Sequence, residues 1–463
     1  MDTFEILKAF DTKMQKHAVR LHGCVLMQGE QVIAGHYRPP YTAQKANRMY
    51  STTKSVIAVA IGLALGEGKL SLEDKVADFF RDEIDMSQLH PYAAEMTVRN
   101  LLMMSTAYSK PTYSPKNMDW LASYFCAPAT HPADTLWWYD SSGSYVLGAI
   151  VKRVTGMPVG DYLRPLFDEI GVSPEAYFLN GPDGETWAGS GFIATTSDLA
   201  RIAYLLLNHG RWNGKQLLPE DYAIAATAPK IQNDDGATHT RFNCGYGYQI
   251  WILPEGAFAF KGMGGQLAIG FPGRDLVFAC NADTQGNNTT YDDILNGVED
   301  IILPHFPITD RTEFDRVQPK AVTETVFDAI ENVNYKLNDN HMHIASLRFE
   351  REGETYKLFY TRRGTEHCIP FAIDRETTIS FPQKYSGRRL FCPETDMQYR
   401  CSVIGRWLEP HKIHIRVWAE DLYVGNMSMC FSFRGDRIGV KMARNAQFFF
   451  DDFNGFAGGE AVR

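Results

Sequence analysis

The amino-acid sequence predicts an α+β protein with two domains, of which the second is all-β. The chain has 463 residues, and a single hydrophobic core usually stops growing at about 250–300 residues. Strand-like segments lie on both sides of a long helical stretch in the first part of the chain. Beyond residue 325 the pattern changes to short strand-like runs separated by turn signals, which is typical of an all-β domain.

The predicted first domain covers residues 1–310 and begins with a helix and a hairpin. Apolar residues at helical spacing over 4–10 predict a short amphipathic helix. Residues 24–27 and 32–34 predict two strands around a turn at Gly29-Glu30.

The middle of this domain is predicted to be mainly helical. Residues 53–65 are apolar on almost every side, so we expect a helix that is buried rather than exposed on one face. From residue 71 to about 229, helical segments alternate with long connections rich in Pro, Ser and Gly. Ser197-Asp198 is expected to cap one of these helices, over residues 199–208.

The sheet of the first domain is predicted to combine strands from both ends of the domain. After Gly245 the sequence returns to strand-like runs, with Pro272-Gly273 as one turn. These strands are expected as an antiparallel meander over residues 246–253, 258–261, 266–271 and 275–282. An antiparallel sheet with helices, interrupted by an all-helical subdomain, makes one α+β domain.

A linker is predicted at residues 311–324, in a charged region that Pro304, Pro307 and Pro319 interrupt. Residues 325–463 are expected to form the all-β domain, as a barrel or a sandwich. Its turn signals are Glu352-Gly353, Arg363-Gly364, Ser386-Gly387, Glu409-Pro410 and Arg434-Gly435-Asp436. No serine–lysine, histidine–aspartate or metal-ligand pattern occurs there, so we expect this domain to supply no catalytic group.

Composition argues against several classes of partner. The formal net charge of −9, without a basic cluster, disfavours a nucleic acid or an anionic membrane. The chain begins with acidic residues where a secretory signal carries positive charge, and its longest apolar stretch, 55–65, is about half of the roughly 20 residues that span a membrane. We therefore expect a soluble, cytoplasmic protein. Eight cysteines without a C-x-x-C pair and thirteen histidines without ligand spacing indicate reduced thiols and no metal or other cofactor.

Ser51 and Lys54 form an S-x-x-K pair at the start of the predicted buried helix. Residues three apart on a helix share one face, so the two side chains can meet. A serine hydroxyl becomes a nucleophile when a neighbouring base takes its proton, and a lysine in a dry site can lose its charge and serve as that base. The alternative is a capping serine beside a surface lysine. The apolar continuation of the helix and the absence of a second S-x-x-K favour the catalytic interpretation.

Tyr139-Asp140-Ser141 is the second candidate segment. A tyrosine hydroxyl can relay a proton between a nucleophile and a leaving group. Because Trp137 and Trp138 precede it, a purely structural tyrosine in an aromatic cluster is the alternative.

A glycine-rich strand end, Lys261-Gly262-Met263-Gly264-Gly265-Gln266, is the third candidate. Its glycines would allow a substrate to approach the backbone closely, and an N–H here could complete an oxyanion hole. A glycine-rich hairpin without catalytic meaning is the alternative.

Together these segments resemble the motif order of the serine β-lactamase and penicillin-binding-protein superfamily: S-x-x-K, then Y-x-S or Y-x-N, then a K-x-G-like strand. The resemblance spans about residues 15–300 and points to the class C-related branch of esterases, D-aminopeptidases and aminohexanoate-dimer hydrolases. Further landmarks that resemble this branch are Met49–Ser55, Glu67–Asp74, Met96–Leu102, Gly191–Arg201 and Tyr246–Tyr248.

The resemblance implies a role for each candidate residue. Ser51 would be the acylated nucleophile, Lys54 its base and Tyr139 the proton relay. The oxyanion hole would combine the Ser51 N–H with one N–H from the glycine strand. Ser141 and Gln266 would contact the substrate.

The sequence departs from the lactamase pattern at two places. Ser141 stands where many lactamases have asparagine. If Gly262 is the glycine of the K-x-G triad, the following N–H donor is Met263; if Gly264 is, the donor is Gly265. Neither register begins with lysine or histidine, which favours the esterase and amidase side of the superfamily over an efficient lactamase.

The sequence therefore predicts a serine hydrolase that forms an acyl-enzyme with a small ester, amide or peptide substrate. The alternative is a degenerate relative that binds peptide or cell-wall-like ligands without turnover. Intact Ser51, Lys54 and Tyr139 favour the enzyme. The oligomeric state and the natural substrate stay open.

Overall fold

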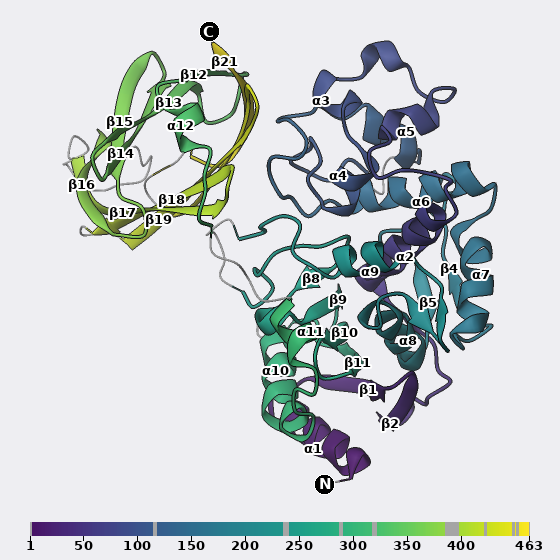
Figure 1. Cartoon of the computed structure of the whole chain (residues 1–463). Coiled ribbons are helices and arrows are strands. Elements are labelled where there is room, and N and C mark those ends of the chain that lie inside the picture. Colours follow the sequence, from purple (N-terminus) through teal and green to yellow (C-terminus); the bar gives the residue numbers. More distant parts are fainter. Residues whose placement is uncertain are drawn as a thin grey trace.

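The computed structural model describes residues 2–113, 118–234, 240–286, 290–316, 322–384, 398–420, 424–446, 450 and 453–462. Figure 1 shows three parts: a sheet flanked by helices near the N-terminus, a helical subdomain above it, and a C-terminal β-barrel beside the helices. The predicted α+β class with a C-terminal all-β domain is confirmed.

The first domain is built on a six-stranded antiparallel sheet with the order β2-β1-β11-β10-β9-β8. Its strands are β1 (Arg20–Gln28), β2 (Gln31–Tyr37), β8 (Trp251–Ile252), β9 (Phe258–Gly262), β10 (Gln266–Phe271) and β11 (Leu276–Asp283). Cys24 of β1 lies opposite Cys280 of β11, so strands from both ends of the domain meet, as predicted. The expected strand over 246–253 is wrong for most of its length: only Trp251–Ile252 pairs as β8, because the preceding residues form a buried turn around Gln249, whose φ is +59°.

Both faces of this sheet are covered. Leu26 of β1 belongs to one hydrophobic core with Phe10 of α1 (Thr3–Lys16), whereas its neighbour Val25 belongs to the core of the helical side. Helix α10 (Thr290–Gly297) lies beside α1, and α8 (Thr196–Leu207) packs on the opposite face. Alternating strand residues therefore supply two cores.

The α8 helix begins earlier than predicted. Thr195 and Asp198 form a reciprocal capping box, in which each side chain accepts a hydrogen bond from the other residue's backbone N–H. The predicted Ser197-Asp198 cap is therefore wrong in register, because the threonine three residues before Asp198 completes the capping box.

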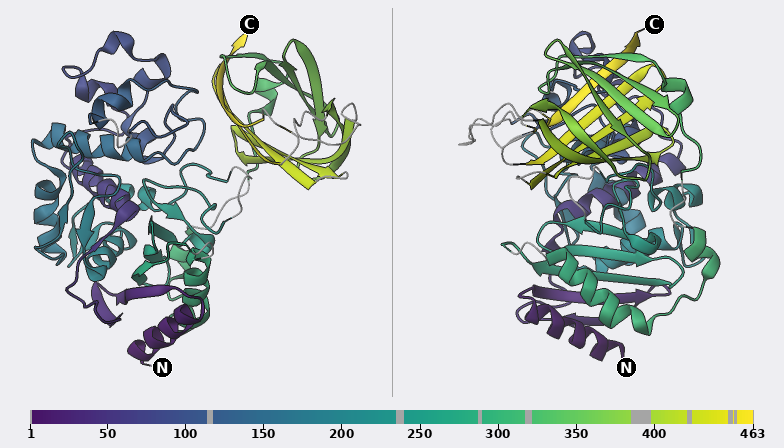
Figure 2. Two further views of the ribbon diagram at one scale, coloured as in Figure 1. Left: turned by 180° about the vertical axis from the view of Figure 1, so that it is seen from behind. Right: turned by 90° about the vertical axis from the view of Figure 1, so that its left-hand side faces the viewer.

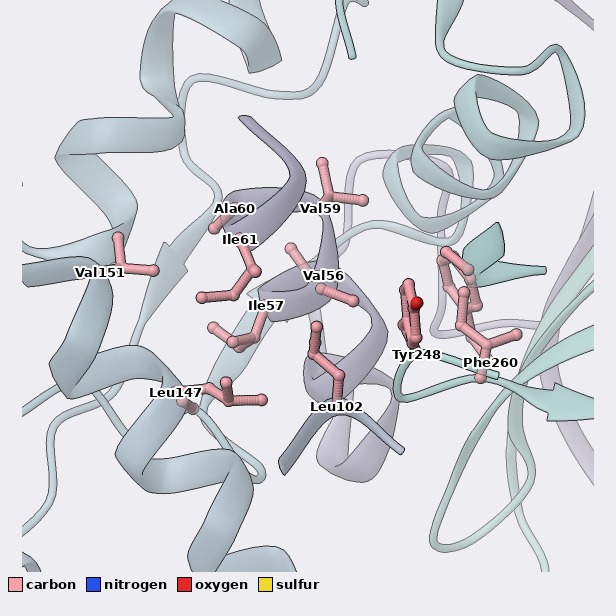
Figure 3. Close-up of a cluster of buried hydrophobic side chains, with 14 of the residues drawn as sticks. Val56, Ile57, Val59, Ala60, Ile61, Leu102, Leu147, Val151, Tyr248 and Phe260 are labelled. Atoms are coloured by element: carbon pink, nitrogen blue, oxygen red, sulfur yellow. The ribbon is translucent and has the colours of Figure 1, made fainter. Parts of the chain in front are cut away.

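The helical subdomain surrounds α2 (Thr53–Gly66), the buried helix that the sequence predicts. Its other main helices are α3 (Pro91–Ala94), α4 (Val98–Leu102), α5 (Trp120–Phe125), α6 (Ser141–Thr155), α7 (Val159–Glu169) and α9 (Glu220–Ala226). Figure 3 shows Leu147 and Val151 of α6 on one side of α2, with Tyr248 and Phe260 on the other. Two small sheets complete the domain, with the strand orders β3-β5-β4 and β6-β7. Their strands are β3 (Asn47–Arg48), β4 (Tyr177–Phe178), β5 (Phe192–Ala194), β6 (Arg211–Trp212) and β7 (Lys215–Gln216).

A polar bridge crosses this apolar centre. The Ser55 hydroxyl of α2 donates to the carbonyl of Gln249 at 2.7 Å, and the Ser144 hydroxyl of α6 donates to the Gln249 side-chain oxygen at 2.6 Å. Buried hydrogen bonds of this kind fix the relative position of the two helices that carry the candidate residues.

The C-terminal domain is a ten-stranded antiparallel sheet that curls into a nearly closed barrel (Figure 2). Its strands are β12 (Asn334–Leu337), β13 (Ile344–Glu352), β14 (Thr355–Arg362), β15 (Thr365–Phe371), β16 (Thr377–Lys384), β17 (Gln398–Glu409), β18 (Lys412–Glu420), β19 (Val424–Arg434), β20 (Arg437–Ala446) and β21 (Gly455–Val462). The end strands β15 and β16 lie against each other. Large apolar side chains such as Phe349, Phe381 and Phe431 fill its interior. The predicted turn at Ser386-Gly387 lies outside the described residues.

The expected linker region contains helix α11 (Arg311–Arg316), which packs on the Gly273 turn of the first domain. A short helix, α12 (Phe327–Ile330), then leads into the barrel. Within the described residues, no helix combines the length and apolar character needed to cross a membrane.

Replacing Ile57 by alanine is expected to lower the free energy of unfolding by about 2–5 kcal/mol, because the change leaves a cavity in the fully buried core around α2. Denaturation in urea, followed by circular dichroism, measures the loss. Leu63→Ala on the partly exposed side of the same helix is the control and should cost less. An equal or smaller loss for Ile57→Ala would contradict the described burial.

Candidate active site

Ser51 lies in a short 3-10 turn, η1 (Tyr50–Thr52), immediately before α2. Tyr50 has a φ of +47°, and the Thr52 hydroxyl donates to the carbonyl of Met49 at 2.9 Å, so the turn is held tightly. Ser51 is only half-buried. The capping position of α2 belongs to Thr52 and carries no side-chain cap, so Ser51 does not act as a helix cap.

Lys54 is the buried partner of Ser51. Its side chain is 1 % exposed. The ammonium group donates to the Ser51 hydroxyl at 3.2 Å and to the carbonyl of Gly189 at 2.5 Å. Burial lowers the pKa of Lys54 to about 7, against an opposing effect of the Asp140 carboxylate. Near neutral pH a large fraction of this lysine is therefore uncharged.

Tyr139 reaches Ser51 from the segment that precedes α6. Burial raises the pKa of its hydroxyl well above the usual value, although a hydrogen bond with Ser51 lowers it. The ring stacks on Trp251 with centroids 5.4 Å apart, and the Lys54 nitrogen lies 5.2 Å from its centroid. Because its pKa is raised, Tyr139 stays protonated at neutral pH and is a hydrogen-bond donor.

Asp140 is buried next to these groups and caps α6. Its carboxylate accepts hydrogen bonds from the Ser142 N–H at 2.8 Å and the Thr106 hydroxyl at 3.4 Å. Burial raises the pKa of Asp140 to about 6, against these hydrogen bonds. Its negative charge acts on Lys54. In the sequence, Asp140 is only the middle residue of the Y-x-S motif, and the motif predicts no role for it.

The glycine strand runs against the turn that carries Ser51. A Cβ atom at Gly262 would lie 2.5 Å from the carbonyl oxygen of Met49 and 3.1 Å from the backbone nitrogen of Thr52. A Cβ atom at Gly264 would instead lie 3.2 Å from the side-chain nitrogen of Gln266, and one at Gly265 would lie 3.0 Å from the Thr284 side chain. Of the two K-x-G registers, this geometry favours Gly262, with Met263 as the next N–H donor.

The two expected substrate contacts, Ser141 and Gln266, lie on the different elements α6 and β10. Ser141 begins α6 and forms a hydrogen bond with Tyr113. Gln266 is 4 % exposed, and its amide is engaged by the Ala282 carbonyl at 2.7 Å and by the Asn281 side chain at 2.7 Å. Gln266 also lines a cavity of about 300 Å³ with Arg48, Tyr50 and Gly264.

Two further features were missed by the sequence analysis. Gly189 accepts the hydrogen bond of Lys54, and a Cβ atom there would lie 3.1 Å from the Ser141 carbonyl oxygen, so only glycine fits without a shift. The glycine-rich run 188–191 was a signal for such an approach. The Lys261 ammonium group lies 4.1 to 4.7 Å from the centroids of three rings, those of Phe242, Trp251 and Tyr291.

In the part of the chain that the structure describes, no group of three His, Cys, Asp or Glu side chains is placed to hold a metal ion.

Comparison with protein families matches residues 8–297 to the family described as Beta-lactamase. This match covers more than half of the 463 residues.

A curated relative, the 6-aminohexanoate-dimer hydrolase of Paenarthrobacter ureafaciens, is 21 % identical over 259 residues. The alignment covers 52 % of this chain and 66 % of that protein, just under two thirds of its length. Among solved structures, an octameric penicillin-binding protein homologue from Pyrococcus abyssi aligns with 99 % of this chain and all of its own, at a TM-score of 0.54 and 16 % identity. A penicillin-binding protein homologue from Caulobacter crescentus covers 65 % of this chain and 97 % of its own, at a TM-score of 0.51 and 18 % identity. At these low sequence identities, the solved structures show a shared fold with this chain.

Asp140→Asn is expected to lower the pKa of Lys54 below its value of about 7, because it removes the negative charge that favours the ammonium form. Asparagine can still accept the Ser142 hydrogen bond, so the cap of α6 is kept. Nuclear magnetic resonance of isotope-labelled lysine, titrated with pH, measures the change.

Asp119→Asn, which neutralises the cap of α5, is the control, since only burial and Asp140 shift the Lys54 pKa. An Asp140→Asn protein with an unchanged or higher Lys54 pKa would show that the two groups do not interact.

Proposed function

The chain belongs to the β-lactamase family, and on that basis we propose that it is a serine hydrolase that forms an acyl-enzyme at Ser51 with a small ester or amide. The observation that carries this proposal is the contact between the half-buried Ser51 hydroxyl and the buried Lys54 nitrogen, 3.2 Å apart. A nucleophile within hydrogen-bond distance of a base is the arrangement that covalent catalysis needs.

The pKa values divide the work between the two groups beside Ser51. Lys54, with a pKa of about 7, can be neutral and take a proton at neutral pH. Tyr139 has a raised pKa and holds its proton. We therefore assign the base to Lys54 and the proton donor to Tyr139.

Acylation then proceeds in two balanced steps. Neutral Lys54 takes the hydroxyl proton of Ser51 as the oxygen attacks the substrate carbonyl. The N–H groups of Ser51 and Met263 stabilise the oxyanion, each 10²–10³-fold in rate if they act as typical donors of this kind, or about 3–4 kcal/mol. Tyr139 donates its proton to the leaving oxygen or nitrogen as that bond breaks, and regains a proton from Lys54. Water then hydrolyses the ester on Ser51 by the reverse sequence.

The substrate class follows from the same residues. Ser141 takes the place of an asparagine found in many lactamases. In the K-x-G-like triad that ends at Gly262, the first position is Phe260 instead of lysine or histidine. We propose small esters and amides, with β-lactams poor substrates. The name of the Paenarthrobacter relative, a hydrolase of a small dimer, supports this class. Gly265 and Gln266 shape the hairpin that follows the oxyanion donor, and Gln266 lines the neighbouring cavity.

The competing proposal is a protein of the same fold that binds a peptide or cell-wall-like ligand without turnover. A binding protein has no need for an accessible serine beside a lysine of lowered pKa, because an uncharged buried lysine loses its attraction for anions. A covalent probe separates the two proposals.

Ser51→Ala is expected to abolish covalent labelling by a fluorophosphonate probe and all ester turnover, because it removes the only proposed nucleophile. Peptide mapping by mass spectrometry locates the adduct. The stability should change by about 1 kcal/mol or less, the usual contribution of one hydrogen bond. Ser55→Ala, four residues along and bonded to Gln249, is the control and should label normally. An adduct that persists on the Ser51→Ala protein would refute the assignment.

Tyr139→Phe is expected to lower kcat/KM for ethyl butyrate by ~10²–10⁴-fold, the usual range for losing a general acid. The same change should affect p-nitrophenyl butyrate little, because nitrophenolate leaves without protonation. The two esters share one acyl group, so kcat/KM isolates the leaving-group step. Equal losses on both esters, or no loss on either, would argue for a structural tyrosine.

A further inference from the structure

The segment that carries Tyr139 has no regular structure of its own. Residues 126–140 connect α5 to α6 without forming a helix or strand. On the inner side three backbone hydrogen bonds hold it to residues 104–107: Thr130 to Ala107 at 2.9 Å, Asp134 to Ser105 at 2.9 Å, and Trp138 to Met104 at 3.0 Å. Side chains of the same segment also contact the C-terminal barrel.

Strand β21, drawn in yellow in Figure 1, is on the side of the barrel that faces the helical subdomain. Its Phe456 stacks on His131 at 5.2 Å between centroids and meets Trp138 edge to face at 5.7 Å. The Lys441 nitrogen of β20 lies 5.4 Å from the Phe456 centroid and 5.8 Å from that of Trp138. One barrel side chain, Phe456, therefore contacts the segment at both His131 and Trp138.

Two glycines let the barrel strands approach the segment directly. A Cβ atom at Gly439 of β20 would lie 2.4 Å from the Thr135 hydroxyl oxygen and 2.8 Å from the Thr135 Cβ. A Cβ atom at Gly458 of β21 would lie 2.9 Å from the Cα of His131. Thr135 and His131 are fully buried, so neither can move aside into solvent.

Polar contacts surround this apolar centre. Arg437 forms a two-pronged ion pair with Glu95, one branch of which measures 2.9 Å. Arg434 donates to the carbonyl of Ala133 at 3.1 Å. Charged contacts at the rim of an apolar patch fix orientation more than they add affinity.

The contact continues into the active site. Trp138, covered by Phe456, directly precedes Tyr139 in the chain. Its neighbour Trp137 packs near the Tyr139 ring at 6.3 Å and against Trp251 at 5.6 Å. A displacement of the segment by about 1 Å is enough to misplace a catalytic group and cost on the order of 10²-fold in rate.

We propose that the barrel is part of the catalytic unit, and that Gly439 and Phe456 are positioning residues that hold the 131–138 segment so that Tyr139 faces Ser51. This inference rests on the proposed function. The barrel itself contributes no group to the reaction; it acts through the position of Tyr139.

Gly439→Ala tests the proposal in the full-length protein. The added methyl group must push Thr135 away, so kcat/KM for ethyl butyrate should fall by at least about 10-fold, while kcat/KM for p-nitrophenyl butyrate stays within about threefold. The ratio of kcat/KM for ethyl butyrate to kcat/KM for p-nitrophenyl butyrate should therefore fall, as it should in Tyr139→Phe. A general loss of stability would lower both rates together.

Two further variants complete the test. Gly405→Ala places the same methyl group against Phe371 inside the barrel, away from the segment, and should leave the ratio of the two rates unchanged. Phe456→Leu removes the ring contacts while keeping an apolar side chain, and should also lower the ratio of the ethyl butyrate rate to the p-nitrophenyl butyrate rate. It provides the test if Gly439→Ala does not fold.

The outcomes distinguish the inference from the proposed function. The positioning role would be overturned if the wild-type protein labels at Ser51 while Gly439→Ala and Phe456→Leu both keep the wild-type ratio of the two rates. An equal change of the ratio in Gly405→Ala would also overturn it, because any damage to the barrel would then suffice. A wild-type protein that neither labels nor cleaves either ester would contradict the proposed function, and the inference with it.

Discussion

The burial of the Lys54 ammonium group is the constraint on which the rest of the site depends. A charged lysine in an apolar environment is costly unless it is paired, and the usual response is loss of the proton. Lys54 has no ion-pair partner among the described contacts of its nitrogen, which are the Ser51 hydroxyl and the Gly189 carbonyl. The apolar surroundings of Lys54 therefore stabilise the fold and also lower the lysine pKa towards neutrality.

The surrounding elements limit how far this shift goes. Asp140, which caps α6, places a buried negative charge where it opposes the effect of burial on Lys54. Its own pKa of about 6 shows that the carboxyl group also resists ionisation at this depth. The charge on Asp140 therefore favours the charged form of Lys54 and keeps its pKa from falling further.

The architecture brings three separate parts of the chain to Ser51. Helix α2 supplies Lys54, the sheet supplies the strand end at Gly262, and the segment before α6 supplies Tyr139. Glycines occur where these parts approach one another closely: Gly262 against the turn that carries Ser51, Gly189 against Ser141, and Gly439 against Thr135. At each of these positions a Cβ atom would lie closer to a neighbouring atom than ordinary packing allows. The absence of a side chain at these glycines therefore permits the parts to pack this closely.

The sequence by itself determined what depends on neighbouring residues. The contact of Ser51 with Lys54 follows from their three-residue spacing, which the turn η1 and the first turn of α2 bring together. The burial of α2 follows from its uniformly apolar composition. The two-domain α+β organisation also followed, because strand periodicity and turn residues are local signals. Local signals failed where a buried turn replaced the expected strand before Trp251, and where Thr195 rather than Ser197 began α8.

Only the tertiary structure decided what depends on residues far apart in the chain. Tyr139 follows Ser51 by 88 positions, and Gly189 lies 135 positions after Lys54, so no local pattern could place either beside its partner. The charge of Asp140 near Lys54, the close approach of Gly262 to the turn that carries Ser51, and the contact of the barrel with residues 131–138 also depend on residues far apart in the chain. The physical reason is that hydrogen-bond distance, burial and the electric field of a charge depend on positions in space, which the packing of the whole chain sets.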